Sequence, residues 1–157
     1  CSVGSITIRS FRRRLDSVLA LIKKWEGCKL KAYKDGGGVW TIGYGTTFYP
    51  DGSKVKEDDI CTMEQAEQWL QIHCNNLVFE ILHEVKSTLK ENQLAALVCF
   101  VYNIGMGAFK KSTMLKLLNE GKYGEAAGQF PRWNKDNGKE VQGLTNRRLD
   151  EQKLFLS

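Results

Sequence analysis

Apolar side chains recur at every third or fourth position near the start of the chain, a spacing that gathers them on one face of a helix. We expect this helix to begin at Ser10, a residue type that caps helices. Its apolar positions are Phe11, Leu15, Val18, Leu19, Ile22 and Trp25. Gly27 is a typical stop signal, so Glu26 should lie in the last turn, where the helix dipole disfavours a negative charge.

The pattern changes between Leu30 and Ile60. Apolar and polar residues alternate in LKAY and VWTIGYGT, glycines are frequent from Gly36 to Gly45, and PDG marks a turn. This combination predicts a small antiparallel sheet with tight connections.

Helical spacing returns after residue 61. Thr62 and Gln65 form a capping box, and the apolar positions that follow predict one long helix as far as Val85, bent near residues 75–76. Residues 92–104 are apolar on nearly all sides, as in a helix at the centre of a bundle. Further helices are expected at 112–119, 123–133 and 144–155.

The fold class that these segments predict is α+β. A small antiparallel β lobe and a larger, all-helical lobe are joined by a long helix, and an active-site cleft is expected between the lobes. We expect a single domain over 1–157. Its parts are an N-terminal extension at 1–14, the first helix and β lobe at 15–61, and the helical lobe at 62–157.

Charge favours anionic partners without identifying one. The chain has 23 Lys and Arg against 18 Asp and Glu, a net charge of +5, and it has no apolar run of the length that a bilayer requires. We therefore expect a soluble protein without stable membrane insertion. Basic residues at 12–14 and 147–148 lack any nucleic-acid-binding motif, so solvated helix faces explain them and no specific nucleic-acid partner is predicted.

The five cysteines include no CxxC pair, and their odd number excludes complete pairing within one chain. Cys74 and Cys99 lie in apolar helical patterns, which favours buried free thiols, although one disulfide stays open. His73 and His83 have no partners at ligand spacing, so no metal is expected.

Three residues around the glycine-rich turn could carry hydrolysis. Glu26, at an unfavourable helix end beside Trp25, is suited to hold a proton as a general acid. Asp35 precedes three glycines, where water can keep it ionised, and the Thr41 hydroxyl could help it to hold a water. Taken singly, these residues are also ordinary choices for a solvated helix end, a turn and a strand.

The grouping of these residues resembles the phage-type lysozymes, glycoside hydrolase family 24. The spacing of Glu26, Asp35 and Thr41 within WEG and AYKDGGGVWTIGYGT is similar to the Glu-Asp-Thr triad of that family. Two later segments also resemble the family, FVYNIGMGAFKKSTMLKLLNEGKYGEAAGQFPRW and GLTNRRLDEQKLFL, so the resemblance covers about residues 15–157.

The resemblance implies a muramidase that cleaves the β-1,4 bond between N-acetylmuramic acid and N-acetylglucosamine in peptidoglycan, with inversion and without a cofactor. Glu26 would be the general acid, and Asp35 and Thr41 would position and activate the water. The saccharide-binding residues that it implies are Gly45, Tyr102, Asn103, Ser112 and Gln129.

The same resemblance implies a monomer that is made in a host cytoplasm and acts on the cell wall after release through a pore formed by another protein. Two alternatives stay open. A lytic transglycosylase would need only the acid, and a non-catalytic peptidoglycan-binding module would need none of the three residues.

Overall fold

The computed structural model describes residues 8–136 and 138–157, and the chain divides into two compact units. One unit is Leu19–Asn76, and the other joins the segment ending at Val18 to Leu77–Ser157. The division falls within helix α2 (Met63–Glu84). The first half of α2 belongs with the strands because its Trp69 packs against their apolar cluster. The predicted domain boundaries, interlobe cleft and bend at 75–76 stay predictions.

Helix α1 spans Ile8–Glu26, so the prediction that Ser10 caps it is wrong. Serine is tolerated within helices, and here the helix extends beyond it into the segment predicted as an extension. Residues 1–7 lie outside the described part. The predicted end of the helix is confirmed, because Gly27 has a φ of 66° and its amide donates to the Lys23 carbonyl at 3.0 Å.

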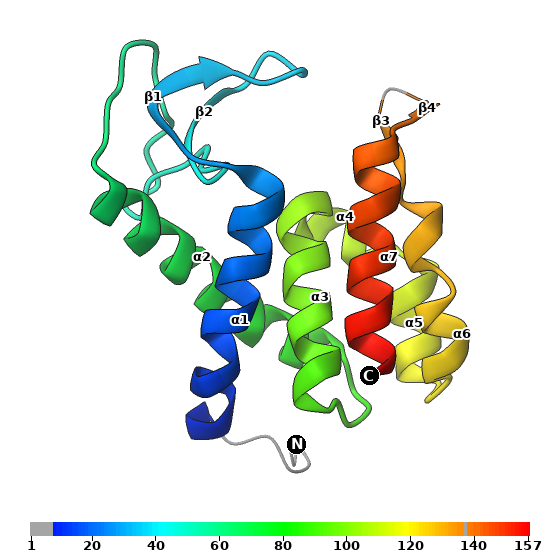
Figure 1. Ribbon diagram of the computed structural model, residues 1–157. Coiled ribbons are helices and arrows are strands. Elements are labelled where there is room, and N and C mark those ends of the chain that lie inside the picture. Colours follow the sequence, from blue (N-terminus) through cyan, green and yellow to red (C-terminus); the bar gives the residue numbers. More distant parts are fainter. Residues whose placement is uncertain (1–7, 137) are drawn as a thin grey trace. The chain divides into compact units, whose positions relative to one another are not determined.

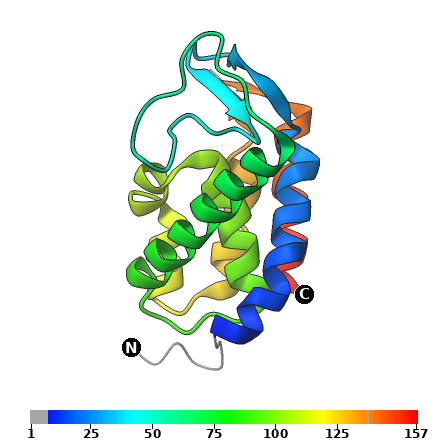
Figure 2. The ribbon, with the colours of Figure 1, turned by 90° about the vertical axis from the view of Figure 1, so that its left-hand side faces the viewer.

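Strands β1 (Lys29–Lys34) and β2 (Trp40–Gly43) form the predicted antiparallel sheet, with Tyr33 opposite Thr41. One face of this sheet is apolar. Ala32 and Ile42 are buried there with Val55, and the half-buried residues packed against them are Trp40, Tyr49, Cys61 and Trp69. A long irregular segment, residues 44–62, connects β2 to α2 (Figure 2).

The predicted capping box at the start of α2 is confirmed. The Gln65 amide donates to the Thr62 hydroxyl at 3.1 Å, and the Thr62 amide donates to the Gln65 side chain at 3.0 Å. These bonds satisfy two backbone groups that a helix start leaves without partners, so the position of α2 is specified locally.

The second unit is built around α3 (Glu91–Ile104), whose residues 94–102 are all buried, as its apolar sequence predicts. Helix α7 (Gln142–Leu156) packs along α3 (Figure 1). Phe130 lies between them, with ring centroids 5.1 Å from Phe100 and 5.7 Å from Phe155. The shorter elements are α4 (Met106–Lys110), α5 (Thr113–Asn119), α6 (Tyr123–Ala127), a 3-10 helix (Phe130–Arg132), β3 (Lys135–Asp136) and β4 (Lys139–Glu140).

Two predictions about this unit are wrong. The helix predicted at 123–133 ends at Ala127, because Gly128 caps it and Pro131, which lacks an N–H group, lies in the separate 3-10 helix. The lobe is also not all-helical. Strands β3 and β4 pair as a short hairpin whose connection contains Gly138 at a φ of 79°.

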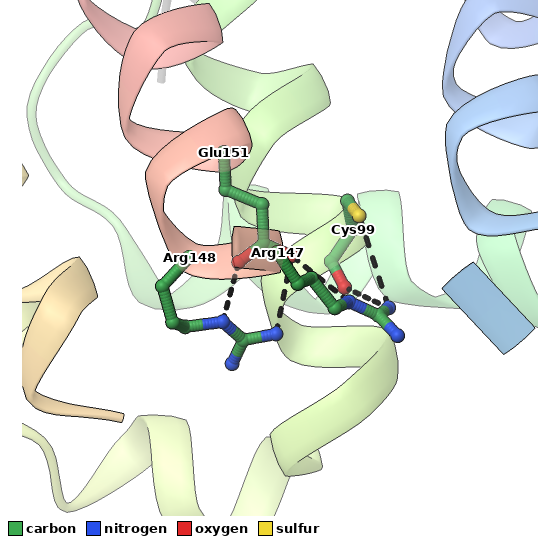
Figure 3. A network of polar contacts seen from close by, with 4 residues as sticks. All are labelled: Cys99, Arg147, Arg148 and Glu151. Carbon is green, nitrogen blue, oxygen red and sulfur yellow. Dashed lines mark hydrogen bonds and ion pairs between the residues drawn. The ribbon is translucent and has the colours of Figure 1, made fainter. Parts of the chain in front are cut away.

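Arg147 and Arg148 of α7 are buried. The sequence suggested instead that they lie on a solvated helix face. Figure 3 shows their contacts. Arg148 Nε lies 2.7 Å from Glu151 Oε1, and Arg147 Nε lies 3.3 Å from Glu151 Oε2. Arg147 also donates to the Cys99 carbonyl at 3.0 Å. Burial raises the pKa of Glu151, although both arginine charges act to lower it. These charges therefore form an internal network between α7 and α3 rather than a solvated face.

Candidate active site

Glu26 is the last residue of α1 and is half-buried. The helix terminates there because Gly27 adopts a left-handed conformation that few other residues tolerate. A carboxylate at this end of a helix faces the negative end of the dipole. This half-buried helix end is where the structure places the candidate general acid.

Asp35 lies in the turn between β1 and β2 and is exposed to solvent. Its Oδ1 atom accepts hydrogen bonds from the Gly37 amide at 2.8 Å and the Val39 amide at 2.9 Å. Within the described residues Oδ2 accepts none. The turn therefore fixes one carboxylate oxygen and leaves the other to face solvent.

Of the three glycines after Asp35, only Gly38 has a positive φ, of 80°. Its amide donates to the Asp35 carbonyl at 3.0 Å, which closes the turn. Gly38 is thus the one of these three glycines whose backbone conformation few other residues would adopt. Gly36 and Gly37 leave space near the carboxylate, because an added Cβ would meet nothing within 4 Å at Gly36 and only Asp35 Oδ1 at Gly37.

Val39 connects Asp35 to Thr41. Its carbonyl accepts from the Asp35 amide at 3.0 Å and from the Thr41 hydroxyl, also at 3.0 Å. With its proton committed to Val39, the Thr41 oxygen can still accept a hydrogen bond from a water molecule. The backbone of one residue, Val39, thus holds both the carboxylate, through its amide, and the hydroxyl, through its carbonyl.

The two faces of the sheet differ in chemistry. Side chains alternate along a strand, and directly opposed residues share a face. Ala32 and Ile42 face the apolar cluster, so Tyr33 and its partner Thr41 face the other way. The Asp35 amide extends the ladder to Val39, which places Asp35 on the same face as Tyr33. Asp35 and Thr41 therefore share one face, as the sequence predicts.

Tyr33 was not singled out from the sequence, although its position two residues before Asp35 is the signal that places it on this face. The pKa of its hydroxyl is raised, first by burial and then by the negative charges of Glu26 and Asp35. Both carboxylates therefore act on a single phenol, and it is this phenol that relates Glu26 to the sheet face that carries Asp35 and Thr41.

The residues that the family resemblance implies for saccharide binding fall in both units. Gly45, with a φ of 88°, lies in the turn that Ile42 and Thr46 close through two backbone hydrogen bonds. The other four lie in the second unit, where Asn103 is exposed, Gln129 half-buried, and Tyr102 and Ser112 buried.

Ser112 has a clear structural role in that unit. Its hydroxyl donates to the Phe109 carbonyl at 2.7 Å and accepts from the Leu115 amide at 3.1 Å, so it caps α5.

The predicted buried thiols are also found, since Cys74 and Cys99 are free and fully buried. Of the helices in the part of the chain that the structure describes, none is long and apolar enough to span a bilayer.

The chain is similar to known proteins along most of its length. Residues 23–151 match the family model described as phage lysozyme. An endolysin of Bacillus phage PZA is 46% identical over 139 residues, which cover 87% of this chain and 52% of that protein. The chain thus spans about half the length of this relative.

Solved structures of similar proteins have the same fold. An endolysin from Escherichia coli O157:H7 phage FAHEc1 aligns with a TM-score of 0.79 and 36% identity, covering 98% of this chain and 96% of that one. The muramidase domain of SpmX from Asticaccaulis excentricus aligns with a TM-score of 0.78 and 34% identity, covering 90% of this chain and 95% of that one. The fold is α+β and lysozyme-like, and the chain belongs to the phage lysozyme family.

Proposed function

We propose that this chain is a peptidoglycan hydrolase, and more specifically an N-acetylmuramidase. It cleaves the β-1,4 bond between N-acetylmuramic acid and N-acetylglucosamine with inversion, and so degrades the bacterial cell wall. Membership of the phage lysozyme family supports this proposal, as does a structural neighbour that is itself a muramidase domain. The single observation that carries it is that the Asp35 carboxylate and the Thr41 hydroxyl are both hydrogen-bonded to the backbone of one residue, Val39.

In this mechanism Glu26 is the general acid. Its half-buried position at the end of α1 suits a carboxyl group that donates a proton to the leaving glycosidic oxygen. An inverting enzyme needs a second carboxylate on the opposite side of the sugar, roughly 6.5 to 9.5 Å away, to leave room for a water molecule.

Asp35 and Thr41 hold and activate that water. Because Asp35 Oδ1 is occupied by the turn amides, we assign proton abstraction to Oδ2. The Thr41 hydroxyl donates to Val39, so its oxygen accepts from the water and orients it. The attack of this water on the anomeric carbon gives a product of inverted configuration.

We assign saccharide contacts to Gly45, Tyr102, Asn103, Ser112 and Gln129, as the family resemblance implies. The chain acts as a single catalytic domain and a monomer, without a cofactor and without a nucleic-acid partner. It is made in a host cytoplasm and acts on peptidoglycan after release to the periplasm or wall.

Lytic transglycosylation is the nearest alternative. It also needs an acid at the position of Glu26, but its nucleophile is a hydroxyl of the sugar rather than a water. The bonds of Asp35 and Thr41 to Val39 favour hydrolysis, because they hold a carboxylate and a hydroxyl together as a pair that can bind a water. A non-catalytic wall-binding module would leave all three residues dispensable.

Digestion of purified peptidoglycan tests the proposal. We expect new reducing ends on N-acetylmuramic acid with the α configuration, which early NMR spectra of the products would detect. Glu26→Gln is the control and should bind the glycan without turnover. Products with 1,6-anhydro ends would contradict hydrolysis, and a fully active Glu26→Gln variant would overturn the mechanism.

A further inference from the structure

We propose that the Tyr33 hydroxyl hydrogen-bonds the sugar at the point of cleavage, so that Tyr33 positions the substrate between Glu26 and Asp35. This inference rests on the proposed function. It assigns a substrate-binding role to a residue that neither the Glu-Asp-Thr spacing nor the residues implied for saccharide binding include.

The register of the sheet places Tyr33 at the centre of the site. Tyr33 lies directly opposite Thr41, and opposed residues of an antiparallel pair have Cβ atoms about 4.5 to 5.5 Å apart. Asp35 follows on the same face after one alternation. A tyrosine side chain is longer than either of these side chains, so its hydroxyl can reach a ligand that lies over this face of the sheet.

Electrostatics locate Glu26 near the same hydroxyl. The negative charges of Glu26 and Asp35 both oppose ionisation of Tyr33, which requires that each carboxylate lies close enough to the phenol to interact with it. Tyr33 thus interacts with both carboxylates that the proposed mechanism places around the scissile bond.

The hydroxyl is available for a ligand. Within the described residues it has no protein hydrogen-bond partner. The hydroxyl groups of two other tyrosines form hydrogen bonds within the protein. Tyr49 donates to Asp59 at 2.6 Å, and Tyr123 donates to the Thr88 carbonyl. Tyr33 is half-buried, and a hydroxyl group in such a position is stabilised when it forms a hydrogen bond. The hydroxyl and acetamido groups of a saccharide can supply this bond.

A neutral donor is also the appropriate chemistry at this position. A lysine or arginine between the two carboxylates would favour the ionised form of Glu26 and so remove the proton that the leaving oxygen needs. Tyr33 is kept protonated by its surroundings, so it donates or accepts a hydrogen bond without adding charge.

Tyr33→Phe tests the inference, because it removes the hydroxyl and keeps the ring. We expect kcat/KM for peptidoglycan to fall about tenfold, the effect of roughly one hydrogen bond, with an unchanged melting temperature. The matched control is Tyr49→Phe, which removes a phenol hydroxyl bonded to Asp59 in the same unit. It should lower the melting temperature and leave kcat/KM unchanged.

Binding measured without chemistry separates this inference from the proposed function. In a Glu26→Gln background, calorimetry with a soluble oligosaccharide of alternating N-acetylglucosamine and N-acetylmuramic acid should show weaker binding when Tyr33→Phe is added. If the wild type cleaves peptidoglycan and Tyr33→Phe matches it in kcat/KM and in binding, this inference alone is overturned. A wild type that does not cleave would overturn the proposed function, and this inference with it.

Discussion

Asp35 and Val39 hold each other through two hydrogen bonds across the turn between β1 and β2. The Val39 amide donates to Asp35 Oδ1 at 2.9 Å, and the Asp35 amide donates to the Val39 carbonyl at 3.0 Å. The same carbonyl accepts the Thr41 hydroxyl at 3.0 Å. The two residues that we assign to the nucleophilic water are therefore positioned by the backbone of one residue, and substitutions can separate their chemistry from their structural role.

Asp35→Asn should abolish most turnover while preserving the turn. The amide oxygen of asparagine can accept from Gly37 and Val39 as Oδ1 does, but the amide nitrogen cannot accept a proton from water. Loss of a general base costs about 100-fold to 10,000-fold in rate, so we expect kcat to fall within that range. Release of reducing ends, measured beside the melting temperature, checks this.

Asp35→Ala is the comparison for that variant, since it also removes the two bonds to the turn amides. It should lose stability as well as activity. An Asp35→Asn variant with the wild-type rate would show that this carboxylate takes no proton, and the inverting mechanism would need another base.

Thr41→Val should reduce turnover with a small effect on folding. Valine has nearly the same shape, so the buried side chain is replaced without a cavity, and the loss is one hydrogen bond to Val39, worth about 1 kcal/mol. The nucleophilic water loses one of the two side chains proposed to bind it, so we expect kcat to fall at least about tenfold. Thr41→Ser keeps the hydroxyl and should retain more activity than Thr41→Val. Equal rates for these two variants would contradict the assigned role.

Gly38→Ala should destabilise the chain, whereas Gly36→Ala should not. An added Cβ meets nothing within 4 Å at either position, so the two substitutions differ only in backbone conformation. Gly38 has a φ of 80°, in the left-handed region where other residues pay about 1 to 2 kcal/mol, and Gly36 does not. Urea denaturation measures the difference. Gly38→Ala should also lower kcat, because this turn holds Asp35, and equal effects of the two variants would contradict this account.

The candidate site could be predicted from the sequence because its signals are local. Gly27 ends α1 at Glu26, and the alternation of a strand places Asp35 and Thr41 on one face, so neither prediction needed long-range contacts. Tyr33 was overlooked because aromatic residues are common in strands, and its relation to Glu26 appears only in three dimensions.

The failures have equally specific causes. Strands of two residues, such as β3 and β4, are too short to show alternation. Arg147 and Arg148 were interpreted as solvated because charged residues rarely lie inside proteins. The signal that they are paired was the spacing of three and four residues to Glu151 along one helix, where such side chains meet.

Low pH should lower the stability of the folded state, partly because the Asp59 carboxylate becomes protonated. This carboxylate accepts from the Tyr49 hydroxyl at 2.6 Å and the Lys56 amide at 2.9 Å, and these bonds, that from Tyr49 first, lower its pKa. A carboxyl group whose pKa is lowered by folding stabilises the folded state above its unfolded pKa, near 4. That stabilisation is lost as the pH falls through the folded pKa.

We therefore expect Asp59→Asn to flatten the fall in unfolding free energy between about pH 5 and pH 2, measured by urea denaturation at each pH. Tyr49→Phe should flatten it as well, because it removes the larger cause of the shift. If the wild type and Asp59→Asn show the same acid slope, the pH dependence has another origin.

Glu151→Ala should be the most destabilising of these substitutions. Glu151 is fully buried, and its carboxylate pairs with Arg148 at 2.7 Å and Arg147 at 3.3 Å. Removing one member of a buried ion pair costs about 3 to 5 kcal/mol, because the charges that stay inside lose their counter-charge. The network lies within α7 and reaches Cys99 of α3, so its loss should destabilise the second unit. Urea denaturation measures the change in the free energy of unfolding.

Glu120→Ala is the matched control, since Glu120 lies 3.4 Å from Lys122 in a pair whose side chains are 40% and 53% exposed. Surface pairs contribute about 0 to 1 kcal/mol, so this variant should unfold almost as the wild type does. A second comparison, Arg148→Met with Glu151→Leu, replaces the buried pair by apolar side chains and should be less harmful than Glu151→Ala alone. If the double variant were instead the less stable one, the network would contribute net stability beyond neutralising its own buried charges.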